Sequence, residues 1–293
     1  MDAVITYVDG RDPQWLEDYR RYVNASVNEK RFRDWGTLKY LLRGIETNMP
    51  FIRNVYLVVA RESQVPEWVD RNSLNIVLHS DIIPEGYLPT FNSNTIEMFL
   101  YRIPGLDEEF LYFNDDIFPV AASVPEDFFC GGLPVVNHSR CLLTLNLFKK
   151  MTRNTDRLAR AVAGKGTSPF FIRPQHTVTS MMKSVWEELY SKAGDSILAS
   201  LTPCRNERNL IMYIFSDYMF YQNKTVRRRI SNKHFSLAAT SEKKIVDFLS
   251  APDRKFVCIN DVNMSEDKFL RMRATIVKAF DSLLPVRSRF ELG

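Results

Sequence analysis

The sequence predicts an α/β protein with a mostly parallel sheet and a helical insertion, and two observations lead to this prediction. Short runs rich in Val, Ile, Tyr or Phe alternate with longer segments whose apolar residues recur at helical spacing. The short runs are apolar on both faces, as the strands of a buried parallel sheet are. The 293 residues include 45% hydrophobic and 25% charged side chains, which suits one large or two modest domains.

Five short runs are expected to form strands. In chain order they are Ala3–Val8, Asn54–Ala60, Leu74–Leu78, Phe110–Phe113 and Phe256–Ile259. Helical patterns lie between and after them, at Pro13–Val27, Trp35–Asn48, Asn94–Ile103 and Glu266–Leu284. For the second of these helices, Asp34 is the expected N-cap residue and Pro50 the stop.

The strand signal disappears from about Ser139 to Gln222. Helical patterns dominate there, at Arg140–Ala163, His176–Ala193 and Glu207–Tyr221, and Gly and Pro residues separate them. We therefore expect one Rossmann-like domain over residues 1–293. Its sheet core is formed by 1–138 and 233–293, a helical insertion occupies 139–232, and the final strand returns to the sheet.

Composition excludes several classes of protein. The mean hydropathy is −0.22 and no apolar run reaches 18 residues, which argues against a membrane span. The net charge of only +4 does not favour a nucleic-acid partner. The first dozen residues contain acids and lack the pattern of a signal peptide, so a cytoplasmic location is expected unless an upstream piece has been removed. The four cysteines are scattered without CxxC spacing and are expected to be buried free thiols.

Polar residues follow several of the predicted strands. Asn114-Asp115-Asp116 comes after one strand and Asn260-Asp261 after the last. Ligands bind beyond the carboxyl ends of parallel strands, and adjacent carboxylates suit Mg²⁺ or Mn²⁺ held against a diphosphate. The alternative is an Asx turn in which the acids only accept backbone hydrogen bonds.

Basic residues and one histidine are further candidates. Arg31 and Arg33 precede a predicted helix and are suited to clamp phosphate, although a solvated basic surface is the alternative. His176 is expected to open a helix, where the dipole favours the neutral form that a general base needs; a structural histidine is the alternative. Arg205 also precedes a helical pattern. The run 227–229 is expected to be a solvated face, with contact to anionic lipid as the minority interpretation.

Four blocks together resemble the conserved regions of the Stealth family. The first is Asp2–Gly10, the second begins at 31–34 and continues to Tyr112–Asp116, the third is anchored by His176 and Arg205, and the fourth is Lys255–Asp261. The resemblance spans residues 1 to about 265. The family comprises bacterial capsular polysaccharide phosphotransferases and the α/β subunit of the animal N-acetylglucosamine-1-phosphotransferase. Asp9 stands where the animal enzymes carry Asn, and their long insertions are missing, so the chain looks like a minimal bacterial member.

The resemblance implies a hexose-1-phosphate transferase. Such an enzyme would transfer a sugar 1-phosphate from a UDP-sugar, typically UDP-N-acetylglucosamine (UDP-GlcNAc), to a hydroxyl of an acceptor glycan in capsule or exopolysaccharide synthesis. UMP would leave and Mg²⁺ or Mn²⁺ would be used. The alternative is a metal-dependent glycosyltransferase that releases UDP, and a non-catalytic glycan- or nucleotide-binding module is a more distant one. The expected partners are the nucleotide sugar and an oligo- or polysaccharide, with peripheral contact to the inner membrane or to capsule assembly proteins left open.

The resemblance also implies roles for individual residues. The catalytic positions that match are Asp2, Glu97, Asp116, His176 and Arg205. Substrate-binding positions are Asp9, Arg31, Arg33, Asp34, Ser93, Asn114 and Asn260. Metal ligands are Asp115, Asp116 and Asp261. His176 is expected to activate the acceptor, either as a base or as a transient phosphoryl carrier.

Overall fold

The computed structural model describes residues 1–23, 32–262 and 264–293, and it divides into two compact units. Unit 1 consists of Met1–Asp2, His79–Tyr112 and Pro125–Ile230. Unit 2 consists of Ala3–Leu78, Phe113–Val124 and Ser231–Gly293. Two of the boundaries between the units fall within strands, in β1 (Asp2–Thr6) and in β4 (Glu109–Asn114). The architecture is α/β, as the alternation of strand and helix patterns predicts.

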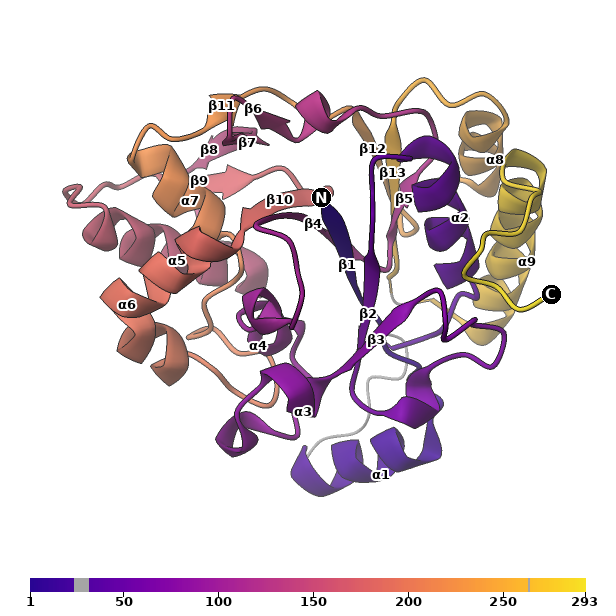
Figure 1. Cartoon of the computed structure of the whole chain (residues 1–293), viewed down its shortest axis with the longest axis horizontal. Coiled ribbons are helices and arrows are strands. Elements are labelled where there is room, and N and C mark those ends of the chain that lie inside the picture. Colours follow the sequence, from indigo (N-terminus) through magenta and orange to yellow (C-terminus); the bar gives the residue numbers. More distant parts are fainter. Residues whose placement is uncertain (24–31, 263) are drawn as a thin grey trace. The chain divides into compact units, whose positions relative to one another are not determined.

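Unit 2 contains the parallel strands that the apolar runs predict. Strand β1 pairs with β2 (Val55–Val59), and β2 pairs with β3 (Asn75–Leu78), both in parallel register (Figure 1). Every residue of β2 is buried, because side chains on both faces of this strand contact protein. Helix α1 (Pro13–Tyr22) begins at the N-cap Asp12, whose side chain accepts from the Trp15 backbone N–H at 2.6 Å.

A second sheet of unit 2 contains the last strand of the chain. Strand β13 (Phe256–Asn260) pairs in parallel with β12 (Asn232–Ser236) and antiparallel with β5 (Ile117–Pro119). The prediction that the final strand returns to the sheet of β1 is therefore wrong. A short apolar strand fits either sheet locally, and its partners are chosen by long-range packing.

Helices of unit 2 cover the sheet formed by β12, β13 and β5. Helix α2 (Leu38–Asn48) lies against β5 so closely that a Cβ on Gly44 would stand 2.4 Å from the Pro119 carbonyl oxygen. On α9 (Glu266–Leu283), the ring of Phe280 lies 4.7 Å from that of Phe118 and stacks on Tyr40 at 5.2 Å. The remaining helix of this layer is α8 (Glu242–Ser250). These contacts form the core below the turn that joins β4 to β5.

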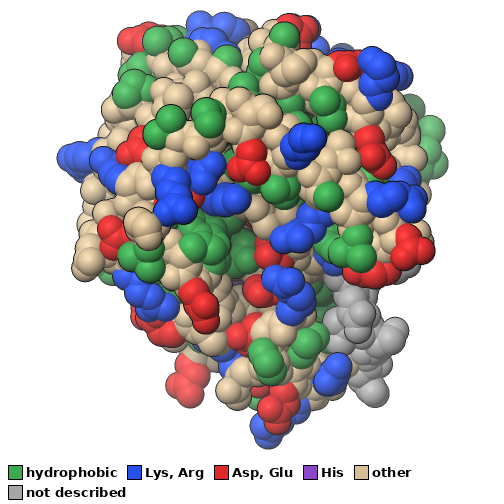
Figure 2. Space-filling view, turned by 90° about the vertical axis from the view of Figure 1, so that its right-hand side faces the viewer, with side chains coloured by type: hydrophobic (Ala, Val, Ile, Leu, Met, Phe, Trp, Pro, Cys, Tyr) green, Lys and Arg blue, Asp and Glu red, His purple; other side chains and the backbone are tan. Residues whose placement is uncertain are grey.

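Charges of both signs are interspersed on the face shown in Figure 2. Basic and acidic side chains alternate with apolar ones over the described part of this face. Such mixing is expected of a protein whose net charge is only +4.

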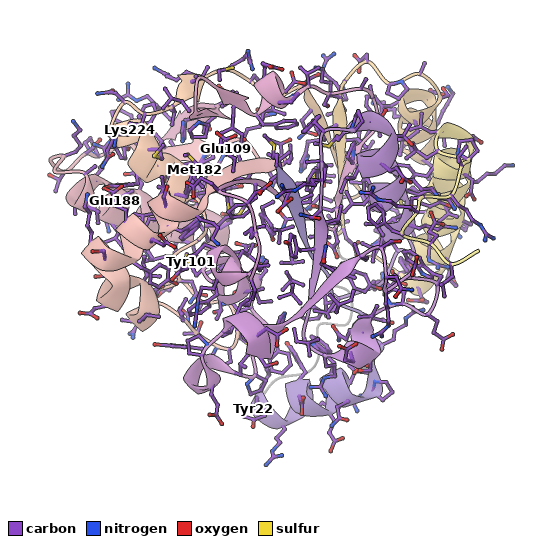
Figure 3. The ribbon with its side chains drawn as sticks, viewed as in Figure 1. Tyr22, Tyr101, Glu109, Met182, Glu188 and Lys224 are labelled. Atoms are coloured by element: carbon purple, nitrogen blue, oxygen red, sulfur yellow. The ribbon has the colours of Figure 1, made fainter. Side chains whose placement is uncertain are left out.

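Unit 1 combines several short β-structures with three longer helices. Strand β10 (Thr179–Met182) pairs antiparallel with β4, and the register places Met182 opposite Glu109 (Figure 3). Strand β8 (His138–Cys141) pairs with β9 (Phe171–Pro174), and β7 (Leu133–Val136) lies between β6 (Phe129–Cys130) and β11 (Val226–Arg227). The longer helices are α5 (Leu147–Val162), α6 (Lys183–Ala199) and α7 (Ile214–Tyr221).

Short helical elements complete unit 1. They are α3 (His79–Ile82), α4 (Ser93–Glu97) and the 3-10 turns Glu85–Tyr87, Leu100–Arg102 and Pro125–Asp127. The helix predicted at Asn94–Ile103 is thus divided into α4 and a 3-10 turn. In unit 2, a further 3-10 turn covers Glu62–Gln64.

The segment predicted as a helical insertion also contains strands. Strands β9, β10 and β11 and most of β8 lie within 139–232, where the sequence carries no strand signal and helical patterns are expected to dominate. His176 lies in a bend between β9 and β10 instead of opening a helix, because α6 begins only at Lys183. Strands as short as these carry little period-2 signal of their own, and cross-strand pairing decides their conformation. The predicted division into one core and one insertion stays a prediction.

Three smaller expectations also differ from the structure. Helix α2 begins after Thr37, and Asp34 instead accepts from the Gly36 backbone N–H at 2.8 Å. All four cysteines are free, as expected, but only Cys258 is buried and the other three are partly exposed. Among the described helices, none combines the length and apolar character required to cross a bilayer.

Candidate functional site

The turn between β4 and β5 in unit 2 presents two of the predicted acids. β4 ends at Asn114, and Asp115 and Asp116 form the turn that leads into β5. Strand β13 holds Asp116 from the side. Asn260 Nδ2 donates to Asp116 Oδ2 at 3.3 Å, and the Ile259 backbone N–H donates to the Asp116 carbonyl at 2.9 Å. The antiparallel pairing of β5 with β13 thus brings Asn260, from the fourth conserved block, next to Asp116, from the second.

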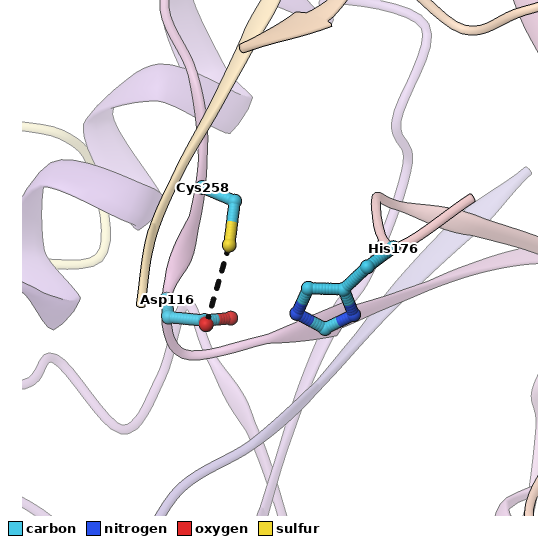
Figure 4. A group of neighbouring side chains, drawn as sticks. All are labelled: Asp116, His176 and Cys258. Carbon is cyan, nitrogen blue, oxygen red and sulfur yellow. Dashed lines mark hydrogen bonds between the residues drawn. The ribbon is translucent and has the colours of Figure 1, made fainter. Parts of the chain in front are cut away.

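Cys258 adds a sulfur contact to the same carboxylate. Its Sγ donates to Asp116 Oδ2 at 3.4 Å, the contact drawn in Figure 4. Burial, together with the negative charge of Asp116, raises the pKa of the thiol. Cys258 is therefore a neutral thiol that orients Asp116 in unit 2. His176, drawn in the same figure, belongs to unit 1.

Asp115 stands among other carboxyl groups of unit 2. Its side chain is accessible to solvent, yet surrounding protein atoms desolvate it and this is the main cause that raises its pKa to about 7. The charges of Asp116, Asp34 and Asp261 raise it further. The acids that the sequence placed in separate blocks therefore interact in the folded unit.

Asp261 is fixed by groups that the sequence did not single out. Trp35 Nε1 donates to its Oδ2 at 3.0 Å, and the Val262 backbone N–H donates to its Oδ1 at 2.6 Å. Burial raises the pKa of Asp261, and these hydrogen bonds and the charge of Arg33 act in the opposite direction. The indole therefore sets the orientation of the carboxylate.

Two linked ion pairs lie beside this group of acids. Asp9 Oδ1 accepts from Arg11 Nε at 3.2 Å, and Arg11 Nη2 donates to Asp34 Oδ2 at 3.0 Å. Burial raises the pKa of the Tyr7 phenol, and the charges of Asp34, Asp9 and Asp115 add to this effect. Tyr7 thus keeps its proton and can donate a hydrogen bond near these acids.

Binding of a divalent cation by the acids of unit 2 stays a prediction. Carboxylate oxygens of Asp115, Asp116 and Asp261 are the hard ligands that Mg²⁺ and Mn²⁺ prefer. The raised pKa of Asp115 reports repulsion among neighbouring acids and desolvation, which a cation beside them would offset. When bound, such an ion would neutralise charge on phosphate oxygens.

The predicted arginines of the second block are placed differently. Arg33 is largely buried, donates to Glu266 Oε2 at 3.1 Å and lies over the ring of Phe269 at 4.7 Å. These contacts tie the segment before α2 to α9, which is a structural task. Arg31 lies outside the described residues. Binding of phosphate by either arginine stays a prediction.

Unit 1 contains the other four predicted catalytic residues, and Glu97 is central among them. Glu97 is buried at the end of α4, and the Tyr112 hydroxyl donates to its Oε1 at 3.2 Å. Burial raises its pKa, while the charge of Arg205, hydrogen bonds from Tyr112 and Ser93, and the charge of His176 oppose this shift. Glu97, Arg205, Ser93 and His176 therefore interact within one unit.

Arg205 approaches α4 from the loop that follows α6. Its Nη2 donates to the hydroxyl of Ser93, the first residue of α4, and its side chain remains exposed. An exposed guanidinium keeps several N–H donors for phosphate oxygens. The helix predicted at Glu207–Tyr221 begins only at Ile214, so Arg205 lies in a loop well before α7.

Buried amides fasten this loop to α4. Asn92, the N-cap residue of α4, donates through Nδ2 to the Thr202 carbonyl at 3.1 Å and to Asn209 Oδ1 at 3.0 Å. The Thr95 hydroxyl also donates to the Thr202 carbonyl, at 3.0 Å, and the Phe91 N–H donates to the Pro203 carbonyl at 2.8 Å. The position of Arg205 is therefore set by side chains that do not themselves carry charge.

Asp2 lies at the start of β1 and is fully buried. Its Oδ2 accepts from the Asp107 backbone N–H at 2.9 Å, and Asp107 in turn pairs with the terminal amine of Met1 at 2.8 Å. These contacts hold Asp2 in unit 1, whereas Asp116 belongs to unit 2. That both units act on one substrate stays a prediction.

Three residues that contact or surround the acids of unit 2 were missed by sequence analysis. Tyr7 and Cys258 each lie two positions before an assigned residue, Asp9 and Asn260, and spacing of two within a strand was the signal that could have found Cys258. Trp35 gave no such signal, because its hydrogen bond to Asp261 joins residues 226 positions apart.

Comparison with known proteins identifies the family. Residues 31–134 match the description "Stealth protein CR2, conserved region 2". The chain is 31% identical to the exopolysaccharide phosphotransferase cps2G of Lactiplantibacillus plantarum, over 99% of this chain and 96% of that protein. It is also 31% identical to the receptor polysaccharide phosphotransferase WefC of Streptococcus oralis, over 100% of this chain and 99% of that one.

Solved structures are more distant. The galactosyltransferase LgtC, in complex with donor and acceptor sugar analogues, aligns over 99% of this chain and 98% of its own with 12% identity and a TM-score of 0.47. The glycosyltransferase GlyE of Streptococcus pneumoniae TIGR4 aligns over 98% of this chain and 65% of its own, with 11% identity and a TM-score of 0.43. The full-length similarity to the two phosphotransferases, together with the matching conserved region, shows that this chain is a transferase enzyme and belongs to the Stealth family.

Proposed function

We propose that this enzyme transfers a sugar 1-phosphate from a UDP-sugar to a hydroxyl of an acceptor glycan and releases UMP. UDP-GlcNAc is the first donor to test, and another UDP-hexose is the next. The observation that carries the proposal is that Glu97 and Arg205 both contact the hydroxyl of Ser93, at the start of α4 in unit 1. A carboxyl group with a raised pKa and an exposed guanidinium stand together there, which supplies a proton acceptor beside a phosphate ligand. The names of the relatives support the same class of reaction.

The proposed reaction assigns one task to each of these groups. The acceptor hydroxyl oxygen attacks the β-phosphorus, and its proton passes to Glu97. The bond between the β-phosphorus and the bridging oxygen breaks, and its electron pair leaves with UMP. Arg205 binds the phosphate oxygens on which charge builds up. His176 interacts with Glu97 and is the second candidate for the proton, or for a transient phosphoryl bond.

Released nucleotide distinguishes this reaction from glycosyl transfer. With UDP-GlcNAc labelled at the β-phosphate, we expect unlabelled UMP and a labelled glycan. Labelled UDP and an unlabelled glycan would overturn the proposal and establish a glycosyltransferase instead. Acid-labile label on the protein, lost in His176→Ala, would assign the phosphoryl bond to His176.

A conservative variant tests the role of Glu97. Glu97→Gln retains an oxygen that can accept from Tyr112 but cannot take a proton, so we expect kcat to fall by roughly 10²–10⁴-fold. The matched control is Glu67→Gln, at an exposed carboxyl of unit 2 for which we expect no change. Since the base must be ionised, the wild-type rate should fall as the pH is lowered through the raised pKa of Glu97. A Glu97→Gln enzyme with the wild-type rate would contradict the assignment.

A further inference from the structure

Unit 1 exposes large apolar side chains in one short stretch of sequence. We call them the leucine patch, and its members are Leu142, Leu143, Leu145, Leu147, Phe148 and Phe170. Leu145 is 77% exposed and Leu143 is 59% exposed. Single exposed apolar residues are common on soluble proteins, but a gathering of this size marks an interaction surface.

The fold brings the members of the patch together. Most of them lie in the connection between β8 and α5 and on the first turn of α5 (Figure 1). The antiparallel register of β8 with β9 pairs Cys141 with Phe171, which places the neighbouring Leu142 and Phe170 at the same end of this strand pair. The guanidinium of Arg140 lies 4.5 Å from the ring centre of Phe170.

The surroundings of the patch are strongly basic. Residues 139–170 contain seven Lys or Arg side chains and one acid, Asp156. That acid is buried, accepts from the Ile172 backbone N–H at 3.0 Å and pairs with Arg160. The exposed Glu207 pairs with Lys150 of this segment at 2.7 Å. The other five Lys or Arg side chains leave the segment with a net positive charge, although the chain as a whole carries only +4.

We propose that the leucine patch binds the surface of a bilayer that contains anionic lipids. Apolar side chains enter the headgroup boundary, and surrounding Lys and Arg side chains are attracted to anionic headgroups. Pairing of the patch with itself in a second copy is disfavoured, because an isologous contact would bring two basic surfaces face to face. The inference concerns a surface of unit 1 and does not rest on the reaction proposed above.

The run 227–229 is a weaker candidate for the same task. Arg227 lies over the ring of Phe220 at 5.4 Å, and Arg228 donates to the Glu126 carbonyl. Both side chains are thus engaged within unit 1. We accordingly place the contact with lipid at the leucine patch.

Co-sedimentation with vesicles tests the proposal on the full-length chain. The probes are vesicles of phosphatidylcholine alone and of phosphatidylcholine mixed with phosphatidylglycerol, each at low and high salt. We expect binding to the mixed vesicles and its weakening by salt. The double variant Leu143→Ser/Leu145→Ser should lower the partition coefficient by at least about tenfold, because two exposed leucines lose their apolar contact. Lys149→Gln/Lys165→Gln should lower it by about fivefold per charge.

A matched control separates the patch from general apolar exposure. Leu270 on α9 is 52% exposed, comparable with Leu143, but belongs to unit 2. Leu270→Ser should bind vesicles as the wild type does, and thermal unfolding should show that all variants are folded. Absence of wild-type binding, or equal loss in Leu270→Ser, would overturn the proposal. A dimer that forms without lipid and is lost in Leu143→Ser/Leu145→Ser would also overturn the proposal, because the patch would then bind a second copy of the chain.

Discussion

Asn209 carries no charge, yet its replacement is expected to disable Arg205. The side chain is buried and makes four hydrogen bonds, three within the loop that follows α6 and one to Asn92 at the start of α4. Its Nδ2 donates to the Ser200 carbonyl at 2.6 Å and to Thr202 Oγ1 at 2.8 Å. Its Oδ1 accepts from the Asn206 backbone N–H at 2.9 Å and from Asn92 Nδ2 at 3.0 Å. Asn209→Ala removes all four.

The free-energy cost of the substitution comes from the buried groups that lose a hydrogen-bond partner. The Ser200 carbonyl and the Asn206 N–H each lose a hydrogen bond in a crowded part of the loop, and each such group costs about 1–3 kcal/mol. A combined loss of about 2–6 kcal/mol shifts the equilibrium between the anchored and released loop by roughly 30- to 25,000-fold. The loop binds the UDP-sugar in its anchored state, and the apparent affinity falls in proportion to the fraction of molecules in that state. KM for the UDP-sugar should therefore rise by tenfold or more.

Steady-state kinetics of Asn209→Ala, Arg205→Ala and the double variant measure this effect. If Asn209 acts through Arg205, the double variant should be no worse than Arg205→Ala alone. Asn72→Ala, at an exposed amide of unit 2, is the control and should leave KM unchanged. Additive losses in kcat/KM would refute the argument, since they would mean that Asn209 works independently of Arg205.

Three further outcomes are expected. Gly44→Ala should lower the free energy of unfolding, measured in urea, by about 1–3 kcal/mol, because its Cβ would collide with a β5 carbonyl oxygen. The control is Gly194→Ala on α6, where the nearest neighbour of the new Cβ lies at 3.7 Å, and it should raise the free energy of unfolding by about 0.5–1 kcal/mol. Equal effects of the two substitutions would contradict the packing of α2 on β5. Burial lowers the pKa of His138 to about 4 and raises that of its neighbour Asp217, so their contributions oppose each other in the wild type. In Asp217→Asn, the free energy of unfolding should therefore fall by up to about 3 kcal/mol as the pH is lowered from about 6.5 to 4, since His138 then binds a proton in the unfolded state but not in the folded state. In His138→Gln, the free energy of unfolding should change with pH in the opposite direction. Thermal unfolding measured at several pH values checks both signs. Excess chelator should abolish turnover and added Mg²⁺ or Mn²⁺ should restore it, and full activity in chelator would remove the cation from the proposal.

Strands with apolar side chains on both faces could be predicted from the sequence to within about two residues. The runs that became β1, β2, β4 and β13 are recognisable because local composition reflects burial on both faces of a strand. The run that became β3 is recognisable by its apolar residues, although only Val77 is buried there. Helix α1 was also marked locally, since Pro13 stands at its first position after Asp12. These features depend on residues within a few positions of one another.

The acids of unit 2 could be predicted for a related reason. Asp115 and Asp116 follow β4 directly, and Asn260 and Asp261 end or follow β13, so each pair is placed by its own strand. Glu97 is different, because nothing local distinguishes it and only the resemblance to a family pointed to it. Its buried position and its interaction with Arg205 come from the fold of unit 1.

Other features were decided only by the tertiary structure. The partners of β13 could not be inferred, since a buried strand offers the same backbone donors and acceptors to either sheet. His176 lies in a bend because β9 and β10 form around it, and these short strands depend on pairing with β8 and β4. Trp35 reaches Asp261, and Asn209 anchors the loop of Arg205, through side-chain hydrogen bonds between segments distant in sequence. Local sequence determines which elements form when burial and periodicity specify them, whereas hydrogen-bond partners over 100 residues apart are selected only when the chain packs.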